Sequence, residues 1–173
     1  RGPAQIGLIR MRQADGLTLA TGIHRTWITP AGRQRMDGVK LNKRMLGVAK
    51  GGFVGFGAPA KRMIVGEGIE TTLAELGRLA LAGQAGDPAD PGEGWTAECA
   101  LSLHAIAGDG DGDHAGRDAQ GHATPSAIPD AAGGGWSPPD ACEDLVILGD
   151  GDMKRPDDAK ALLARAQRRL SVD

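Results

Sequence analysis

The segment Met63–Thr71, with the sequence MIVGEGIET, limits the possible folds of this chain more than any other. A short apolar run ends at Glu67, which stands between two glycines, and an amphipathic helical pattern follows at once. A buried strand of an α/β sheet has this pattern when it brings a carboxylate to the carboxyl edge of the sheet, where such folds place their sites. A second apolar run, 145–148, ends in GDGD and also leads into a helical pattern. We therefore predict an α/β fold in which Glu67, Asp150 and Asp152 meet at one sheet edge.

The region 61–173 has the patterns of a mostly parallel sheet flanked by helices. Its predicted elements are a helix at 69–82, a strand at 96–106, a loop insertion at 107–141, a strand at 144–149 and a helix that begins at Pro156. Loops as long as this one are usually functional or disordered in compact domains. The predicted buried helix faces consist of Ile69, Leu73, Leu76 and Ala80 in the first helix, and Leu163, Ala166 and Leu170 in the last.

The region 1–60 instead has the patterns of a small antiparallel sheet. Residues 6–12 and 17–29 alternate as strands do, and the turn signal at 14–16 lies between them. The glycine-rich stretch 51–57 is expected to include a short strand. We therefore predict that a small basic antiparallel β subdomain precedes the α/β domain.

The net charge of −2 conceals a strong asymmetry along the chain. Residues 1–62 carry twelve Lys or Arg and two acids, whereas residues 63–173 carry eight Lys or Arg and twenty acids. An enzyme that binds phosphates and holds metal ions needs such a division, although two solvated faces would give the same count.

Basic residues are densest between residues 33 and 50, where they lie beside glycines. Clustered Lys and Arg side chains bind phosphates, and exposed backbone N–H groups assist them. We predict that this segment holds a nucleic-acid strand or a nucleotide through Arg33, Arg35, Lys40, Lys43, Arg44 and Lys50.

The acidic strand ends carry the groups that nucleotidyl transfer requires. Mg²⁺ takes one or two carboxylates, with water and substrate oxygens as its other ligands. Asp150 and Asp152 are two residues apart and can turn toward one ion, while Glu67 could complete the site or act as general base on a hydroxyl. Each acid also has an ordinary interpretation, Glu67 as a turn acid or helix N-cap and Asp-Gly-Asp as a turn. Both acidic segments, however, follow apolar strands and precede helices. This shared arrangement favours the metal site over the ordinary interpretations.

Two motifs of this chain resemble those of the Toprim domain, which is shared by bacterial-type primases, topoisomerases and OLD-family nucleases. They are VGEGIET at 65–71 and LGDGD at 148–152, each followed by a helical pattern. The chain is also similar to Toprim domains of primase-helicase-like proteins of phages, plasmids and integrated elements in GIHRTW at 22–27 and KRMLG at 43–47. The resemblance therefore runs from near residue 20 to the end of the chain.

This resemblance implies a Toprim-like fold and Mg²⁺-dependent nucleotidyl transfer of the DNA primase type, with Mn²⁺ able to replace Mg²⁺. The expected partners are a single-stranded DNA template, nucleoside triphosphates, and a helicase or other replication protein. The implied roles are catalytic acid/base for Glu67, Mg²⁺ ligation for Asp150 and Asp152, and phosphate contacts for Lys43, Arg44 and Lys50.

Three departures from the Toprim pattern keep other functions open. Met153 and Lys154 stand where many members have a further acid, the usual last strand is missing, and no flanking zinc-binding or helicase module is present. We therefore expect a piece of a larger protein, truncated at its C-terminus. A Toprim nuclease and a non-catalytic nucleic-acid-binding Toprim module are the alternatives to primer synthesis.

The run GDGDGDHAGRD at 108–118 is an alternative metal motif, because it is similar to the corresponding motif of cellular primases. It offers Asp109, Asp111 and Asp113, but it leads into Gly, Pro and Ser rather than into a helix. A zinc site is also possible on residue type, although its three residues have no recognised spacing. These residues are His104, His114 and His122.

The cysteines and the hydropathy of the chain indicate its cellular compartment and whether it crosses a membrane. Cys99 and Cys142 are far apart, and we expect both to be ordinary reduced thiols. No apolar run approaches the roughly 20 residues that a membrane-spanning helix needs. The sequence therefore predicts a cytoplasmic protein with no membrane partner.

Overall fold

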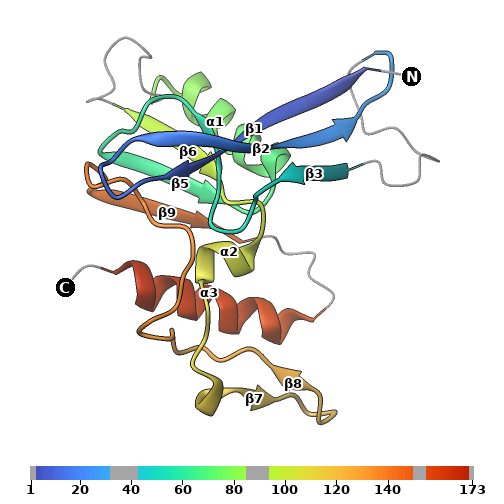
Figure 1. The fold of residues 1–173 in the computed structure, drawn as a ribbon, viewed down its shortest axis with the longest axis vertical. Coiled ribbons are helices and arrows are strands. Elements are labelled where there is room, and N and C mark those ends of the chain that lie inside the picture. The colour runs from blue at the N-terminus through green and yellow to red at the C-terminus, as the bar shows by residue number, and fades with distance from the viewer. Residues whose placement is uncertain (1–2, 32–42, 85–93, 150–154, 172–173) are drawn as a thin grey trace.

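The computed structural model describes residues 3–31, 43–84, 94–149 and 155–171. These ranges form a mixed α/β protein with three sheets and three α-helices (Figure 1). An antiparallel sheet and a larger mixed sheet lie together, while a two-stranded hairpin lies at the opposite end of the view (Figure 1).

The antiparallel sheet has the strand order β1-β2-β3 and consists of β1 (Ala4–Arg12), β2 (Thr18–Trp27) and β3 (Lys43–Gly47). In the β1–β2 turn, Asp15 Oδ1 accepts a hydrogen bond of 3.0 Å from Leu17 N, and Gly16 has a φ of 81° that glycine adopts without strain. This sheet confirms the predicted antiparallel β structure. Its third strand lies in the basic segment, for which the sequence predicted phosphate contacts but no strand.

The mixed sheet has the strand order β4-β6-β5-β9 and consists of β4 (Val54–Phe56), β5 (Arg62–Gly66), β6 (Trp95–Cys99) and β9 (Asp144–Leu148). β5 pairs parallel with both β6 and β9, whereas β4 pairs antiparallel with β6. The expected short strand at 51–57 and the two expected acid-bearing strands are therefore present. β4, which precedes residue 61, pairs with the mixed sheet and not with β1–β3.

Both faces of the mixed sheet are covered, which explains the continuous apolar run in β5. On one face, Ile64 packs with Leu79 of α1 (Ile69–Leu81) and with Ala97 of β6. On the other face, Val65 packs against α2 (Leu103–Ala107) and α3 (Pro156–Leu170). Pro156 at the first position of α3 suits a helix start, since its missing N–H would have no helical partner there.

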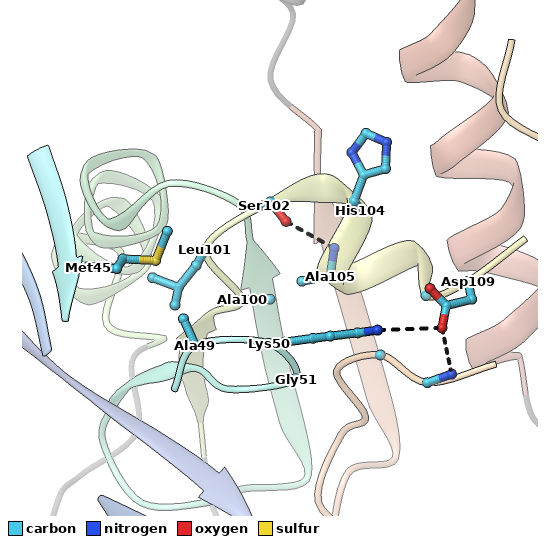
Figure 2. Close-up of a pocket in the computed structure, with 13 residues that line it drawn as sticks. Met45, Ala49, Lys50, Gly51, Ala100, Leu101, Ser102, His104, Ala105 and Asp109 are labelled. Atoms are coloured by element: carbon cyan, nitrogen blue, oxygen red, sulfur yellow. Dashed lines mark hydrogen bonds and ion pairs between the residues drawn. The ribbon is translucent and has the colours of Figure 1, made fainter. Parts of the chain in front are cut away.

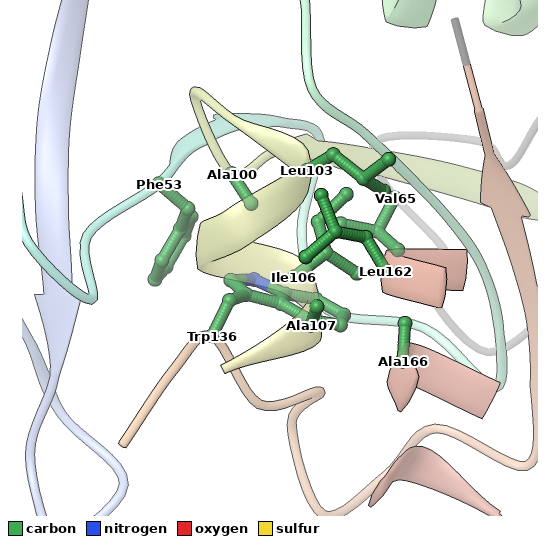
Figure 3. Close-up of a cluster of buried hydrophobic side chains, with 9 residues drawn as sticks. All are labelled: Phe53, Val65, Ala100, Leu103, Ile106, Ala107, Trp136, Leu162 and Ala166. Carbon is green, nitrogen blue, oxygen red and sulfur yellow. The ribbon is translucent and has the colours of Figure 1, made fainter. Parts of the chain in front are cut away.

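The principal hydrophobic cluster lies between the mixed sheet and these two helices (Figure 3). Its members are Phe53, Val65, Ala100, Leu103, Ile106, Ala107, Trp136, Leu162 and Ala166. A smaller cluster joins the two sheets, because Ile9 of β1 packs with Val54, Ile69 and Cys99. Gly7 permits this packing, since a Cβ there would come within 3.1 Å of Ile69 Cδ1.

The predicted strand at 96–106 is wrong in its second half. β6 ends at Cys99, Leu101 takes a φ of 70°, and Ser102 caps α2 by accepting a hydrogen bond of 3.0 Å from Ala105 N. Ser is a favoured N-cap residue, but the apolar run that contains it masked the signal.

The predicted helix faces are partly wrong. In α1 the buried residues are Ile69, Thr72 and Leu79, while Leu73 and Ala80 are exposed. In α3 the prediction holds for Ala166, whereas Leu163 and Leu170 are only partly buried. The two buried residues that it missed in α3 are Leu162 and Arg165.

The predicted loop insertion at 107–141 is folded against the core. It contains a 3₁₀ turn, Gly112–His114, and the hairpin of β7 (Gly116–Arg117) and β8 (Ala123–Thr124). Trp136 from this segment is 1% exposed. Arg165 donates to the Ser126 carbonyl at 3.0 Å, so α3 holds the segment in place.

Candidate functional site

The carboxyl ends of three neighbouring parallel strands lie at one edge of the mixed sheet. Gly66 of β5 stands opposite Cys99 of β6 and opposite Leu148 of β9. The residues that follow these strands therefore leave the sheet at the same edge, Glu67 after β5 and Gly149 after β9. The two predicted metal ligands, Asp150 and Asp152, come next in the chain and lie outside the described residues.

Glu67 lies at the junction of β5, α1 and α2. Its Oε2 accepts a hydrogen bond of 2.9 Å from Leu103 N, at the start of α2, and its backbone carbonyl accepts one of 3.4 Å from Cys99 Sγ. The carboxylate is thus held by a helix N-terminus, where the helix dipole favours a negative charge. Glu67 is half-buried, which leaves part of the side chain accessible for chemistry.

A cavity of about 290 Å³ connects Glu67 with the antiparallel sheet. Lys43, Met45 and His24 border it from β3 and β2, and Glu67 and Ile69 border it from the mixed-sheet edge. The remaining lining residues are Arg44, Gly68, Cys99 and Leu101. The predicted acid and two of the predicted basic residues therefore share one site.

The charges beside this cavity are coupled. Lys43 Nζ lies 3.0 Å from Glu70 Oε1, in the first turn of α1. Burial opposes ionisation of Glu70, but its backbone N–H and Lys43 outweigh this effect and lower the pKa of the carboxyl group. Burial lowers the pKa of His24, and Lys43 lowers it further, while Glu70 acts in the opposite direction. His24 is therefore neutral at pH 7 and can accept a hydrogen bond from a substrate group.

A buried thiol lies behind the acid. Burial raises the pKa of Cys99 to about 11, so the sulfur stays protonated at neutral pH. A thiol in this state is a poor nucleophile, and Cys99 acts here as an apolar wall and a weak donor.

The other predicted basic residues are distributed differently. Arg44 borders the Glu67 cavity but follows Lys43 directly on β3, so the two side chains leave opposite faces of the strand. Lys50 lies in a neighbouring cavity, 4.0 Å from Asp109 Oδ2. Three members of the predicted set lie outside the described residues, namely Arg33, Arg35 and Lys40.

The alternative acidic run at 108–118 places its acids in separate surroundings. Asp109 Oδ2 accepts from Gly134 N at 3.3 Å and faces Lys50. Asp111 accepts from Asp113 N at 2.9 Å and pairs with His114 Nδ1 at 2.8 Å, and these two interactions lower the pKa of its carboxyl group. Asp111 thus caps the 3₁₀ turn that contains Asp113.

Within the described ranges, no three His, Cys, Asp or Glu side chains are grouped so that they could hold a metal ion. The candidate zinc residues have other partners or positions. His114 pairs with Asp111 and His122 with Asp118, while His104 lines the neighbouring cavity. This finding does not apply to the predicted group of Glu67, Asp150 and Asp152, since both aspartates are outside the described ranges.

Sequence reasoning missed several features of the site. His24 was not among the predicted site residues, and its place beside Glu67 depends on the packing of the two sheets. The ion pair of Lys43 with Glu70 spans 27 residues of sequence, so no local pattern could indicate it. Leu101 carried no signal of its positive φ, because leucine rarely adopts that conformation.

Comparisons of the chain with protein families, with curated proteins and with solved structures gave no match. The resemblance to Toprim domains therefore rests on the sequence motifs alone. In the part of the chain that the structure describes, none of the helices has the length and apolar character needed to cross a membrane.

Proposed function

We propose that this chain is a Toprim-like, primase-type nucleotidyltransferase module that makes or extends short primers on single-stranded DNA. One observation carries the proposal: Glu67 shares a cavity with Lys43 at the sheet edge where the GDGD strand also ends. An acid and a cation around one open space are what a hydroxyl nucleophile and a phosphate require.

The roles of the residues follow from their positions. Glu67 accepts the proton of the attacking 3′ hydroxyl, because its carboxylate is fixed by Leu103 N and borders the cavity. The hydroxyl oxygen bonds to the α-phosphorus of the nucleoside triphosphate, and pyrophosphate leaves. Lys43 offsets negative charge on the phosphate and keeps Glu70 ionised nearby. His24, neutral at pH 7, orients a substrate hydroxyl or phosphate oxygen.

The residue types at the edge fit a hard divalent cation. Asp150 and Asp152 would hold Mg²⁺ or Mn²⁺, since carboxylate oxygens are the ligands that both ions take. The parallel register supports this assignment, because Leu148 stands opposite Gly66 and each strand continues into its acidic segment. When bound, the ion would neutralise phosphate charge during transfer.

The proposal extends to partners. The template would be single-stranded DNA, the substrates nucleoside triphosphates, and a helicase or another replication protein would work with the module in the cytoplasm. The positive charge of residues 1–62 supports nucleic-acid binding.

Primer synthesis tests this function directly. The chain is incubated with single-stranded template, Mg²⁺ and either ribonucleotides or deoxynucleotides, and products are resolved on a denaturing gel. Glu67→Gln should lower the rate by about 10²–10⁴-fold, the usual contribution of a general base. It should change the free energy of unfolding by no more than about 1 kcal/mol, since the amide oxygen still accepts from Leu103 N.

Glu143→Gln is the matched control, because Glu143 is an exposed acid that pairs with Lys61 away from the cavity. A parallel plasmid-nicking assay distinguishes a Toprim nuclease, which would use water as nucleophile. Primer synthesis that survives Glu67→Gln would refute the catalytic role of Glu67. Binding of DNA without synthesis or nicking would leave only the non-catalytic module.

The metal assignment has its own test. A crystal soaked in Mn²⁺ should show anomalous density beside Asp150 and Asp152, within reach of the Glu67 edge. Density in the run that contains Asp109, Asp111 and Asp113 would move the metal site to the alternative motif.

A further inference from the structure

A second cavity, of about 310 Å³, lies beside the Glu67 cavity. The two share Met45 and Leu101 as lining residues. Its volume is at the lower end of the range for small-molecule sites, roughly 300–1,000 Å³. A ligand that filled it would therefore also reach toward Glu67.

The walls of this cavity change in character from one end to the other. Figure 2 shows Met45, Leu101 and Ala49 together at one end and Asp109 at the other, with Lys50 extended between them. The apolar end suits the face of a flat ring, and the thioether of Met45 interacts favourably with aromatic rings.

The rest of the lining offers polar groups. Ser102 Oγ, next to Leu101 in the chain, accepts from Ala105 N at 3.0 Å (Figure 2). Asp109 presents a half-exposed carboxylate. Its pairing with Lys50, at 4.0 Å and with the lysine side chain 87% exposed, is weak, so a ligand can displace the ammonium group.

Leu101 adds an independent observation. It is the one residue other than glycine with a positive φ in the described ranges, at 70°. Such strained residues concentrate at ligand-binding positions, and this one stands in the wall that both cavities share.

We infer that this cavity binds the nucleoside part of an incoming nucleoside triphosphate, whose phosphates extend into the Glu67 cavity. The inference rests on the proposed function. The base lies against Met45 and Leu101, and Asp109 accepts hydrogen bonds from the ribose hydroxyls, as acidic residues do in nucleotide-binding folds. The 5′ carbon lies on the same face of the ribose as the base, opposite the hydroxyls, so it leads the phosphates back past the shared wall toward Glu67. A nucleic-acid strand fits less well, because the carboxylate of Asp109 repels its phosphates and Lys50 is the only Lys or Arg among the described lining residues.

The first test compares two ligands by calorimetry in the presence of Mg²⁺. ATP should bind the unmodified chain at least about tenfold more tightly than inorganic triphosphate, because the base buries apolar surface that triphosphate lacks. Ala49→Leu, which fills the apolar end, should remove this preference and leave triphosphate binding unchanged. Ala132→Leu is the matched control at an exposed alanine outside the cavity.

The second test uses the unmodified chain and adenosine, which has no phosphate. In a methyl NMR spectrum the Met45 signal should shift on addition of adenosine. The signals of Met11, which does not line the cavity, and Met63, which is 1% exposed in the core, should stay in place.

The outcomes separate this inference from the function on which it rests. Equal affinity for ATP and inorganic triphosphate, or a Met45 signal unmoved by adenosine, would overturn the nucleoside site while primer synthesis could still depend on Glu67. A chain that binds neither ligand and makes no primer would overturn both.

Discussion

Glu67 follows β5 and Glu98 lies in the neighbouring strand β6 of the mixed sheet, but the protein holds these two acids in opposite ways. Glu98 lies within β6, its side chain is 6% exposed, and it is paired with Arg12 at 2.9 Å and with Trp136 Nε1 at 2.7 Å. Glu67 follows β5, accepts a hydrogen bond of 2.9 Å from Leu103 N and borders a cavity. Glu98 is enclosed by its partners, whereas Glu67 is partly exposed, and this difference supports the chemical role that we propose for Glu67.

The surroundings of Glu98 join three distant parts of the chain. Arg12 comes from β1, Trp136 from the folded insertion, and Glu98 from β6. Arg12 also lies over the Phe53 ring, 4.6 Å from its centroid. The buried acid therefore fixes the antiparallel sheet and the insertion against the mixed sheet.

The comparison also limits what a shifted pKa indicates. Burial raises the pKa of Glu98, and Arg12 and Trp136 only partly offset this effect. Perturbed acids concentrate at functional sites, but buried ion pairs shift them as well. Here the acid with the raised pKa is fully occupied by structural partners, so cavity geometry, and not the pKa, is the basis on which we propose Glu67 as the catalytic residue.

The largest expected effect in this comparison is on stability. Arg12→Met should lower the free energy of unfolding by about 3–5 kcal/mol at pH 7, because it leaves the Glu98 carboxylate buried without its cation. Urea denaturation measures the change. Arg62→Met, at an exposed position at the start of β5, is the control and should change it by no more than about 0.5 kcal/mol. Equal losses of stability in the two variants would show that the Glu98 pair contributes little.

A second prediction concerns pH. Since the pKa of Glu98 is raised in the folded chain, its contribution to stability is fully present below the ordinary carboxyl value of 4.5 and is lost as pH rises through the folded-state value. Glu98→Gln removes this titration. The stability of the unmodified chain relative to Glu98→Gln should therefore fall as pH rises from 4 to 8, measured by chemical denaturation. An opposite slope would mean that Arg12 dominates over burial.

The smallest expected effect concerns the cation at the Glu67 cavity. Lys43→Gln should reduce the dependence of single-stranded DNA affinity on salt, lowering the slope of log affinity against log salt by about 0.7 for each phosphate that Lys43 neutralises. It should cost about 0.2–1 kcal/mol of stability, since its pair with Glu70 is partly exposed. Fluorescence anisotropy at several salt concentrations gives the slope. Lys61→Gln is the control, because Lys61 pairs with Glu143 and does not line the cavity; equal slopes in both variants would argue against binding of phosphate by Lys43.

Much of the fold could be predicted from local patterns. The alternation in β1 and β2, the apolar runs of β5 and β9, and the start of α3 at Pro156 are all visible in the sequence, because each pattern reflects local geometry and burial. The predictions failed where an interaction with a distant part of the chain decided the outcome. β3 is exposed over most of its length and becomes a strand only by pairing with β2.

Some features of the candidate site could likewise be predicted from local sequence, and others depend on distant parts of the chain. The position of Glu67 at a strand end followed from its own segment, and the proposed metal ligands remain a prediction of the sequence. The neighbours of Glu67 did not follow, since Lys43 and His24 reach it only through the packing of one sheet against the other. The cavity that Lys50 and Asp109 border was likewise invisible, because it forms where β3, α2 and loop segments from distant parts of the chain meet.

The sequence by itself determined where buried strands end in acids and where helices begin, because periodicity and helix-start signals act over a few residues. Only the tertiary structure decided which of those acids is enclosed and which faces open space. That choice depends on side chains more than 30 residues away, such as Arg12 and Trp136 around Glu98, and no local pattern records such interactions.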